Sequence, residues 1–264
     1  MKEIISDKNK IFRHALELKK KKYREKWREY LIEGPNLIEE ALKEGIEIKA
    51  LMVRHEAGPE SLNGIGTAFS EVPGDRIYML PPSLFSKLSD TVTPQGVMGI
   101  IGMKDTDPDA LDLNGGNIIV LDRLQDPGNI GTILRTADAA GFSLAVFMKG
   151  TSDPYSPKAV RSAAGSVLRM PVAFFETNEE LSAFLKARDK KLIVSFMTAE
   201  KAYYEEDLSR DCAIVVGNEG NGVSKELIDM ADVKIRIPMA GETESLNASM
   251  AAGILMYERI RSKK

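Results

Sequence analysis

Three glycine-rich segments in the second half of this 264-residue sequence hold the side chains best suited to chemistry. They read DPGNIGTILR (residues 126–135, the first segment), VVGNEGNGVS (residues 215–224, the second segment) and IPMAGETESLNASMAAG (residues 237–253, the third segment). Each follows an apolar run and leads into a helix-like pattern. Because glycine lets the backbone approach a ligand closely, the segments predict a compact ligand held largely by backbone groups.

The segments lack the signatures of the common nucleotide sites. A P-loop needs a lysine and a hydroxyl directly after its glycines, and GNEGNGVSK has neither that spacing nor that ending. A dinucleotide fold needs G-x-G-x-x-G after its first strand, whereas DPGNIGTI has only G-x-x-G, and Glu219 would repel a pyrophosphate. A cationic sulfonium ligand would tolerate Glu219. For any one segment alone, a simple strand-to-helix turn is favoured over a ligand site. The presence of three such segments reverses this and favours a ligand site.

Arg135 occupies an unexpected place, because the sequence predicts it near the start of a helix, where the backbone dipole disfavours cations. The helical period puts it opposite the face expected to meet the core, which comprises Ile130, Ile133, Leu134, Ala137 and Gly141. Its neighbours Gly131, Thr132 and Ala139 leave room for a large ligand. An ion pair with Asp138 is the structural alternative to a substrate contact.

The elements that must position these segments predict an α/β fold. Apolar runs alternate with helical patterns, which favours a parallel sheet covered on both faces, with strands at NIIVLD, SLAVFM, PVAFF, KLIVSFM, AIVVG and VKIRIP. Ser156 before Pro157 predicts a helix N-cap, and Thr177 with Glu180 predicts a capping box. Asn129 and Ser245 are further N-cap candidates. Leu246, Met250, Gly253, Tyr257 and Ile260 share one helical face and are expected in the core or an interface.

The first half has its own α/β pattern. GPNLIEEALKEG predicts a helix with Pro35 in its first turn and Gly45 after its end, and PPSLFSKLS predicts a shorter one; strands are expected at IKALMV, RIYML and GVMGIIGM. The run KDTDPDALDLNGGN is typical of a linker. We therefore expect an N-terminal arm (1–28), a smaller domain (29–105), a linker (106–116) and a second domain (117–264).

Charge is distributed unevenly along the chain. The net charge is −3, but residues 1–28 carry 11 Lys and Arg against 4 Asp and Glu, a balance of +7, and include Tyr23 and Trp27, with Tyr30 just beyond. Cations interleaved with aromatics suit RNA, since they meet phosphates and bases respectively. The alternative is an amphipathic helix that packs through Leu16, Tyr23 and Trp27. The two interpretations remain equally weighted for this arm.

Composition excludes other classes. The single Cys212, which precedes the strand AIVVG, leaves no disulfide framework and favours a cytoplasmic protein with a small buried cysteine. With only two histidines and no cysteine cluster, no metal site is expected. No apolar run reaches the length of a membrane span and no signal peptide opens the chain, so no membrane association is expected.

The three segments, in this order, resemble the three motifs of the SpoU (TrmH) family of RNA ribose methyltransferases, in the SPOUT superfamily. The resemblance covers residues 117–260 and rests on Asn129, Gly131, Arg135, Gly217, Glu219, Gly220, Pro238, Ser245, Leu246 and Asn247. EGPNLIEEAL and SDTVTPQGVMGII more weakly resemble the family's substrate-binding domain, which is related to an RNA-binding ribosomal protein.

The resemblance implies a deep trefoil knot in the second domain, a homodimer and S-adenosylmethionine as methyl donor. It implies a cofactor site at Gly217, Asn218, Glu219, Gly220, Ile237, Met239, Ser245 and Leu246, and catalytic roles for Arg135, Asn129, Glu219, Ser245 and Asn247. Glu219 and Ser245 would orient Arg135 or the substrate. Because a guanidinium keeps its proton far above neutral pH, Arg135 suits holding a phosphate and a developing alkoxide better than acting as a base.

The expected reaction is methyl transfer to a ribose 2′-hydroxyl of RNA, with large-subunit ribosomal RNA as the expected substrate. Transfer RNA is the alternative substrate. A non-catalytic RNA-binding or ribosome assembly factor is the alternative function, and a nicotinamide-dependent oxidoreductase is disfavoured by the missing fingerprint.

Overall fold

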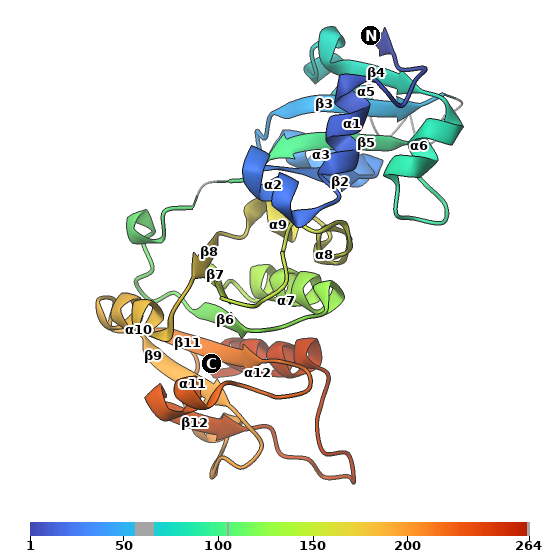
Figure 1. Ribbon diagram of the computed structural model, residues 1–264. Helices are drawn as coiled ribbons and strands as arrows, with labels where there is room; N and C mark the ends of the chain where they lie inside the picture. Colours follow the sequence, from blue (N-terminus) through green and yellow to red (C-terminus); the bar gives the residue numbers. More distant parts are fainter. Residues whose placement is uncertain (56–65, 105, 263–264) are drawn as a thin grey trace. The chain divides into compact units, whose positions relative to one another are not determined.

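The structure, a computed structural model, describes residues 1–55, 66–104 and 106–262. Two compact units make up the chain: the first comprises Met1–Lys104 and Tyr155–Leu168, and the second comprises Asp105–Pro154 and Arg169–Lys264 (Figure 1). The segment Tyr155–Leu168 thus returns to the first unit from within the second half of the sequence. Residue 105, the expected end of the smaller domain, lies outside the described residues.

A five-stranded mixed sheet forms the centre of the first unit. Its strand order is β1 (Lys2–Glu3), β4 (Ile77–Leu80), β3 (Ile48–Arg54), β5 (Val97–Gly102) and β2 (Glu29–Glu33). β4 runs parallel to both of its neighbours, whereas β5 is antiparallel to β3 and β2. The three strands expected from the sequence of this half are therefore present.

The helices of the first unit are α1 (Lys10–Glu17), α2 (Lys21–Trp27), α3 (Pro35–Lys43), α5 (Gly66–Glu71), α6 (Pro82–Leu88), α8 (Pro157–Ala163) and the start of α9 (Ser166–Arg169), with a 3-10 turn at η1 (Gly74–Arg76). As expected, α3 has Pro35 in its first turn, and Gly45 beyond its end has φ +67°. α6 confirms the shorter predicted helix.

The arm predicted at residues 1–28 is a packed part of this unit. α1 contributes Phe12, Ala15 and the following Leu18 to a core that includes Leu31, Met52 and Phe85. Of the three side chains through which the alternative amphipathic helix would pack, Tyr23 is half-buried, whereas Leu16 and Trp27 are 40% and 46% exposed. The single amphipathic helix of that alternative is in fact two helices, because Lys20 is extended between α1 and α2, and α1 buries Phe12 and Ala15 instead.

A seven-stranded parallel sheet forms the second unit, as the alternating apolar runs predict. Its order is β10 (Lys201–Ala202), β12 (Val233–Arg236), β9 (Lys191–Ser195), β11 (Cys212–Gly217), β6 (Ile118–Asp122), β7 (Leu144–Met148) and β8 (Val172–Phe175). The middle strands are buried along their length because helices cover both faces.

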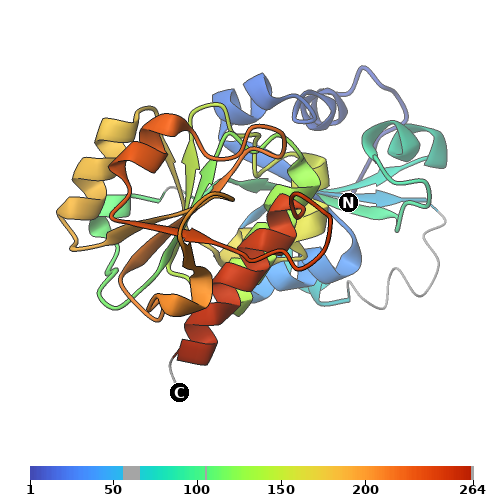
Figure 2. The ribbon, with the colours of Figure 1, turned by 90° about the horizontal axis from the view of Figure 1, so that it is seen from below.

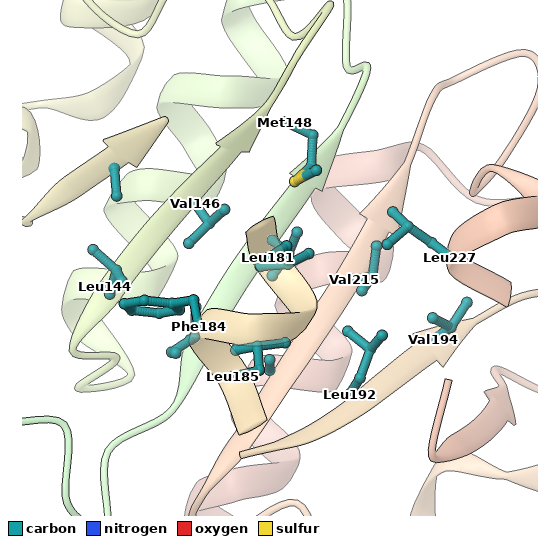
Figure 3. Close-up of a cluster of buried hydrophobic side chains, with 14 of the residues drawn as sticks. Leu144, Val146, Met148, Leu181, Phe184, Leu185, Leu192, Val194, Val215 and Leu227 are labelled. Atoms are coloured by element: carbon teal, nitrogen blue, oxygen red, sulfur yellow. The ribbon is translucent and has the colours of Figure 1, made fainter. Parts of the chain in front are cut away.

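Helices α10 (Asn178–Lys186) and α11 (Lys225–Met230) lie on one side of this sheet, and α12 (Ala248–Ser262) lies on the other, with α7 (Pro127–Ala139) (Figure 2). The first of these sides holds a core of Val146, Leu181, Phe184, Val215 and their neighbours (Figure 3). Short 3-10 turns occur at η2 (Pro108–Ala110) and η3 (Tyr203–Glu205). None of the helices in the described ranges is long and apolar enough to cross a membrane.

The strand order places two loops of the second unit next to each other. β6, β7 and β8 follow one another toward one edge, and the chain then crosses to β9 and returns to β11, which pairs with β6. The direction of winding therefore reverses between β6 and β11. In open α/β sheets, ligands bind beyond the carboxyl ends of strands at such a reversal.

Helix caps differ in part from the sequence prediction. Thr177 and Glu180 form the expected capping box of α10. α7, however, is capped by Asp126, whose carboxylate accepts the N–H of Gly128, so the N-cap predicted at Asn129 is wrong. The N-cap predicted at Ser245 is also wrong, because Asn247 accepts the N–H groups of Ser249 and Met250. Ser156 does precede α8, but its side chain makes no capping bond.

Candidate active site

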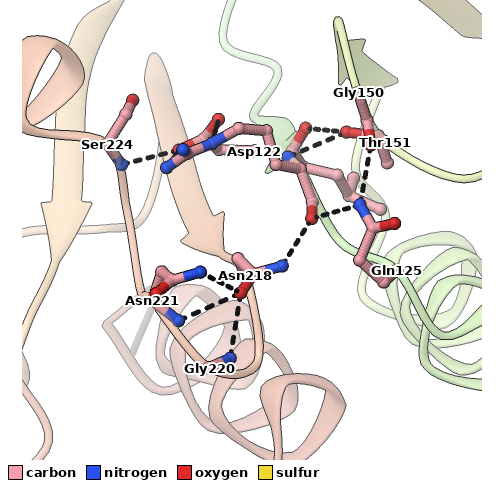
Figure 4. A network of polar contacts seen from close by, with 10 residues as sticks. Asp122, Gln125, Gly150, Thr151, Asn218, Gly220, Asn221 and Ser224 are labelled. Atoms are coloured by element: carbon pink, nitrogen blue, oxygen red, sulfur yellow. Dashed lines mark hydrogen bonds and ion pairs between the residues drawn. The ribbon is translucent and has the colours of Figure 1, made fainter.

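The site begins where β6 and β11 end, and buried polar groups fix the two loops there. Asp122, only 3% exposed, accepts the N–H of Ser224 at 2.7 Å and pairs with Arg123 at 3.1 Å. The amide of Asn218 donates to the carbonyl oxygen of Arg123 at 2.9 Å, and that of Gln125 donates to the same oxygen at 2.9 Å (Figure 4). The loop after β6 is therefore tied to the loop after β11.

The second segment closes into a tight turn that requires glycine. Asn218 and Gly222 exchange backbone hydrogen bonds of 3.0 and 2.9 Å, and the Asn218 side chain accepts the N–H groups of Gly220 and Asn221 (Figure 4). A Cβ atom at Gly217 would overlap backbone atoms of Gly222 and Val223. Glycine is required at position 217 because the backbone of residues 222 and 223 approaches it too closely for a Cβ atom.

Glu219 joins the second segment to the first. Its carboxylate accepts the backbone N–H groups of Gln125 and Asp126, both at 3.1 Å, and the side-chain amide of Asn129 at 3.0 Å. Partial burial raises the pKa of Glu219, but these hydrogen bonds outweigh it and hold the pKa below its usual value of 4.5. The carboxylate is therefore ionised at neutral pH and fixes the start of α7.

Asn129 extends this connection to the third segment. It is 9% exposed, and its Oδ1 accepts the side-chain amide of Asn247 at 3.0 Å. Asn247 in turn caps α12 through its own Oδ1. A continuous chain of hydrogen bonds, from Glu219 through Asn129 to Asn247, therefore joins all three glycine-rich segments.

A cavity of about 500 Å³ opens between the second and third segments, within the size range of small-molecule sites. All eight residues predicted to bind the cofactor line it: Gly217, Asn218, Glu219, Gly220, Ile237, Met239, Ser245 and Leu246. Of the five residues predicted to be catalytic, Glu219 and Ser245 line it, whereas Arg135, Asn129 and Asn247 do not.

One wall of this cavity carries no sequence motif. Ser195, Phe196, Met197 and Thr198 line it from the loop that follows β9, and Glu244 lines it from the third segment. The loop after β9 has no glycine-rich pattern. Its place follows only from the strand order, since β9 lies between β11 and β12 and ends at the same edge of the sheet.

The lining fits S-adenosylmethionine. The apolar side chains of Phe196, Ile237 and Leu246 suit a flat adenine, and the backbone of the glycine turn suits its polar edge. The carboxylates of Glu219 and Glu244 suit a ligand that carries positive charge. In the part of the chain that the structure describes, no three His, Cys, Asp or Glu residues are grouped to hold a metal ion.

Arg135 lies farther along α7 than the sequence suggested. α7 begins at Pro127, so Arg135 is in its third turn and the unfavourable helix start does not apply. The side chain is exposed and makes no hydrogen bond or ion pair with any described residue; Asp138 pairs instead with Arg169 at 2.7 Å. Ile130, Ile133, Leu134 and Ala137 face the core as expected, whereas Gly141 is exposed beyond the helix end.

Several related proteins match almost the whole chain. A 23S rRNA (guanosine(2553)-2′-O)-methyltransferase, RlmP of Bacillus subtilis, is 36% identical over 97% of this chain and 98% of its own length. A 23S rRNA (uridine(2479)-2′-O)-methyltransferase of Streptomyces viridochromogenes is 30% identical over 89% of this chain and 83% of its own. A crystal structure of an AdoMet-bound rRNA methyltransferase from Sinorhizobium meliloti superposes with a TM-score of 0.87 and 31% identity, covering 98% of this chain and 97% of that one.

Two family models match consecutive parts of the chain. Residues 9–99 match an MRM3-like substrate binding domain, and residues 116–257 match the SpoU rRNA methylase family. The latter range contains the three segments and the cavity they line. The chain therefore belongs to the SpoU rRNA methylase family and is an S-adenosylmethionine-dependent RNA 2′-O-methyltransferase.

Proposed function

We propose that this protein methylates a ribose 2′-hydroxyl of 23S ribosomal RNA. The observation that carries the proposal is the hydrogen-bonded chain Glu219–Asn129–Asn247, which holds all three family motifs around one cavity. The two relatives named above for their 23S rRNA positions support the choice of substrate. Their methylated positions and bases differ from each other.

S-adenosylmethionine supplies an electrophilic methyl group when it is bound. We propose that Arg135 is the catalytic residue that meets the RNA, because its guanidinium is exposed and makes no hydrogen bond or ion pair with any described residue. It holds a phosphate of the target nucleotide and stabilises the developing alkoxide, and a phosphate oxygen accepts the hydroxyl proton. Glu219, Asn129 and Asn247 act as positioning residues, since they direct their polar groups toward the loops. Ser245, in the cavity wall, would contact the bound cofactor.

We further propose that two copies associate through α12. The predicted face of this helix is not core: Met250, Tyr257 and Ile260 are 62%, 50% and 40% exposed, and the preceding Leu246 is 39% exposed. The buried side of the helix carries Ala252, Leu255 and Met256 instead. An exposed apolar stripe of this kind is typical of an interface. The double variant Met250→Glu/Tyr257→Glu is expected to be monomeric in light-scattering measurements, whereas the wild type is dimeric.

We also propose the knot, the linker limits and the location of the protein. The trefoil knot is proposed for the second unit from the family resemblance alone, and the linker limits at residues 105 and 116 are proposed from composition. A cytoplasmic location is proposed from the single cysteine.

Mapping of 2′-O-methyl groups tests the function. Purified protein, S-adenosylmethionine and protein-free 23S rRNA are incubated, and the modified ribose is located by mass spectrometry of nuclease fragments. We expect one new methyl group in 23S rRNA and none in a parallel reaction with transfer RNA. Methylation of transfer RNA alone would overturn the choice of substrate. Binding of rRNA without methyl transfer would favour the assembly factor.

A further inference from the structure

The helical hairpin of α1 and α2 presents one large aromatic side chain to solvent. Trp27, the only tryptophan in the sequence, is the last residue of α2 and is 46% exposed. Arg28 ends the helix in a left-handed conformation with φ 54°, and its carbonyl oxygen accepts the N–H of Met103 at 2.8 Å. A backbone bond near the sheet therefore fixes the turn that exposes Trp27.

Neighbouring groups also fix the orientation of the indole ring. The ring of His14 on α1 meets the ring of Trp27 edge-on, with 5.4 Å between centroids and 88° between planes. His14 is held in turn by Glu29, whose carboxylate lies 2.6 Å from Nε2 of His14 and 2.7 Å from Nζ of Lys49. The ring is thus exposed but braced, so a ligand that stacks on it need not order it first.

The surroundings of Trp27 are cationic. Nζ of Lys26 lies 4.8 Å from the centroid of the indole ring, and Nζ of Lys22 lies 4.8 Å from that of Tyr23. Lys20, Lys22 and Lys26 are exposed and form no ion pair with any carboxylate among residues 1–55, 66–104 and 106–262. Unpaired lysines beside an exposed aromatic ring match a polyanion that also carries flat, apolar faces.

We propose that Trp27 stacks on an unpaired base of the RNA substrate while Lys20, Lys22 and Lys26 contact the adjoining phosphates. This inference rests on the proposed function only in taking RNA as the substrate. The base displaces the lone Lys26 ammonium from the ring face, because stacking on indole is the stronger contact. Bases inside a duplex are already stacked on each other, so Trp27 selects a single-stranded loop or bulge of the RNA.

Tryptophan fluorescence tests the proposal, because Trp27 is its only source. The full-length protein is titrated with oligoadenylate of about ten nucleotides, within the site sizes of single-strand binders, and with a blunt RNA duplex of equal length. We expect strong quenching by the single strand and weak quenching by the duplex. Trp27→Ala is expected to weaken single-strand binding, followed by filter retention, by about 5- to 100-fold, and Trp27→Phe to weaken it less.

Matched variants separate stacking from charge. Tyr204→Ala removes another exposed aromatic side chain, 54% exposed in the second unit, and should leave oligoadenylate affinity unchanged. Lys20→Gln/Lys22→Gln/Lys26→Gln should weaken single strand and duplex together and lower the salt dependence of binding. Unchanged fluorescence with bound oligoadenylate, or equal affinity of Trp27→Ala and the wild type, would overturn the proposal. Failure of methylation with quenching intact would overturn the proposed function alone.

Discussion

At the level of single residues, the active site separates side chains that hold its loops from one side chain free to meet a substrate. Glu219, Asn129 and Asn247 direct their polar groups toward the three segments. Arg135 forms no hydrogen bond to a described protein atom through any of its five N–H donors. We therefore expect substitution of Arg135 to change the rate of methyl transfer, and substitution of the other three residues to change the geometry of the loops.

Replacing Arg135 tests that assignment. We expect Arg135→Ala to lower the rate of methyl transfer by about 10²- to 10³-fold, the usual cost of removing one donor to a developing oxyanion. Cofactor affinity and the free energy of unfolding should change little, because the side chain is exposed and does not line the cavity. Single-turnover kinetics and calorimetry with S-adenosylmethionine measure these quantities.

Arg210→Ala, which removes another exposed arginine of the same unit, serves as the matched control and should transfer methyl groups at the wild-type rate. Wild-type transfer by Arg135→Ala would remove the catalytic role. Loss of cofactor affinity would instead give Arg135 a part in the cofactor site.

The lowered pKa of Glu219 predicts a pH dependence of stability. A carboxyl group whose pKa is depressed by folding stabilises the native state above its unfolded value, here 4.5, and that contribution is lost as the pH falls through the folded value. Glu219→Gln should therefore be less stable than the wild type at neutral pH, and the difference should shrink on acidification. Denaturant titrations across this pH range provide the measurement.

Glu242→Gln, which changes an exposed carboxylate of the third segment, should show no such convergence with the wild type. A constant difference between Glu219→Gln and the wild type at every pH would contradict the prediction.

At the level of elements, local sequence patterns predicted most strands and helices. The residues that line the cavity depend instead on which strands pair in the sheet. The apolar runs predicted β6, β7, β8, β9, β11 and β12 because parallel strands buried on both faces are continuously apolar. The wall from Ser195 to Thr198 escaped prediction, since the adjacency of β9 and β11 is a long-range property. The cap of α7 was misplaced by three residues because Asp126 and Asn129 are both good cap residues, and only the bond from Gly128 distinguishes them.

The turn of the second segment predicts that alanine is tolerated at one of its glycines and destabilises the protein at another. Gly217→Ala should destabilise the second unit by about 1–3 kcal/mol, because the new Cβ overlaps backbone atoms rather than a movable side chain. Gly220→Ala, in the same turn, meets nothing closer than the Asn218 side chain at 3.6 Å and should unfold like the wild type. Equal unfolding midpoints for the two variants in urea would contradict this explanation of Gly217.

At the level of the whole molecule, chain order and spatial order differ. The segment Tyr155–Leu168 lies between β7 and β8 in the sequence, yet it belongs to the first unit. There α8 lies beside β2, and a Cβ at Gly165, with φ +90°, would overlap the Glu40 carboxylate. Hydrophobic periodicity predicted the helix but not its unit, because its apolar side would suit either core. The first unit is therefore completed by residues from the methyltransferase half of the chain.

Because the segment Tyr155–Leu168 belongs to the first unit, a substitution at position 155 should destabilise that unit, which is formed mainly by residues 1–104. Tyr155 is 6% exposed, and the centroid of its ring lies 4.9 Å from that of Tyr30. Burial, and to a smaller extent the neighbouring Tyr155, raises the pKa of Tyr30. Truncating a buried aromatic side chain typically costs about 3–5 kcal/mol, so Tyr155→Ala should shift the unfolding transition reported by Trp27 fluorescence to much lower denaturant.

Phe142→Ala provides the comparison, since Phe142 is 5% exposed in the second unit and lies only 13 positions earlier in the sequence. Phe142→Ala should shift the unfolding midpoint followed by Trp27 fluorescence less than Tyr155→Ala does. It should instead lower the midpoint of the part of the circular dichroism transition that Trp27 fluorescence does not follow. If Tyr155→Ala left the Trp27 transition in place, residues 155–168 would have no structural role in the first unit. Its stability would then depend on residues 1–104 alone.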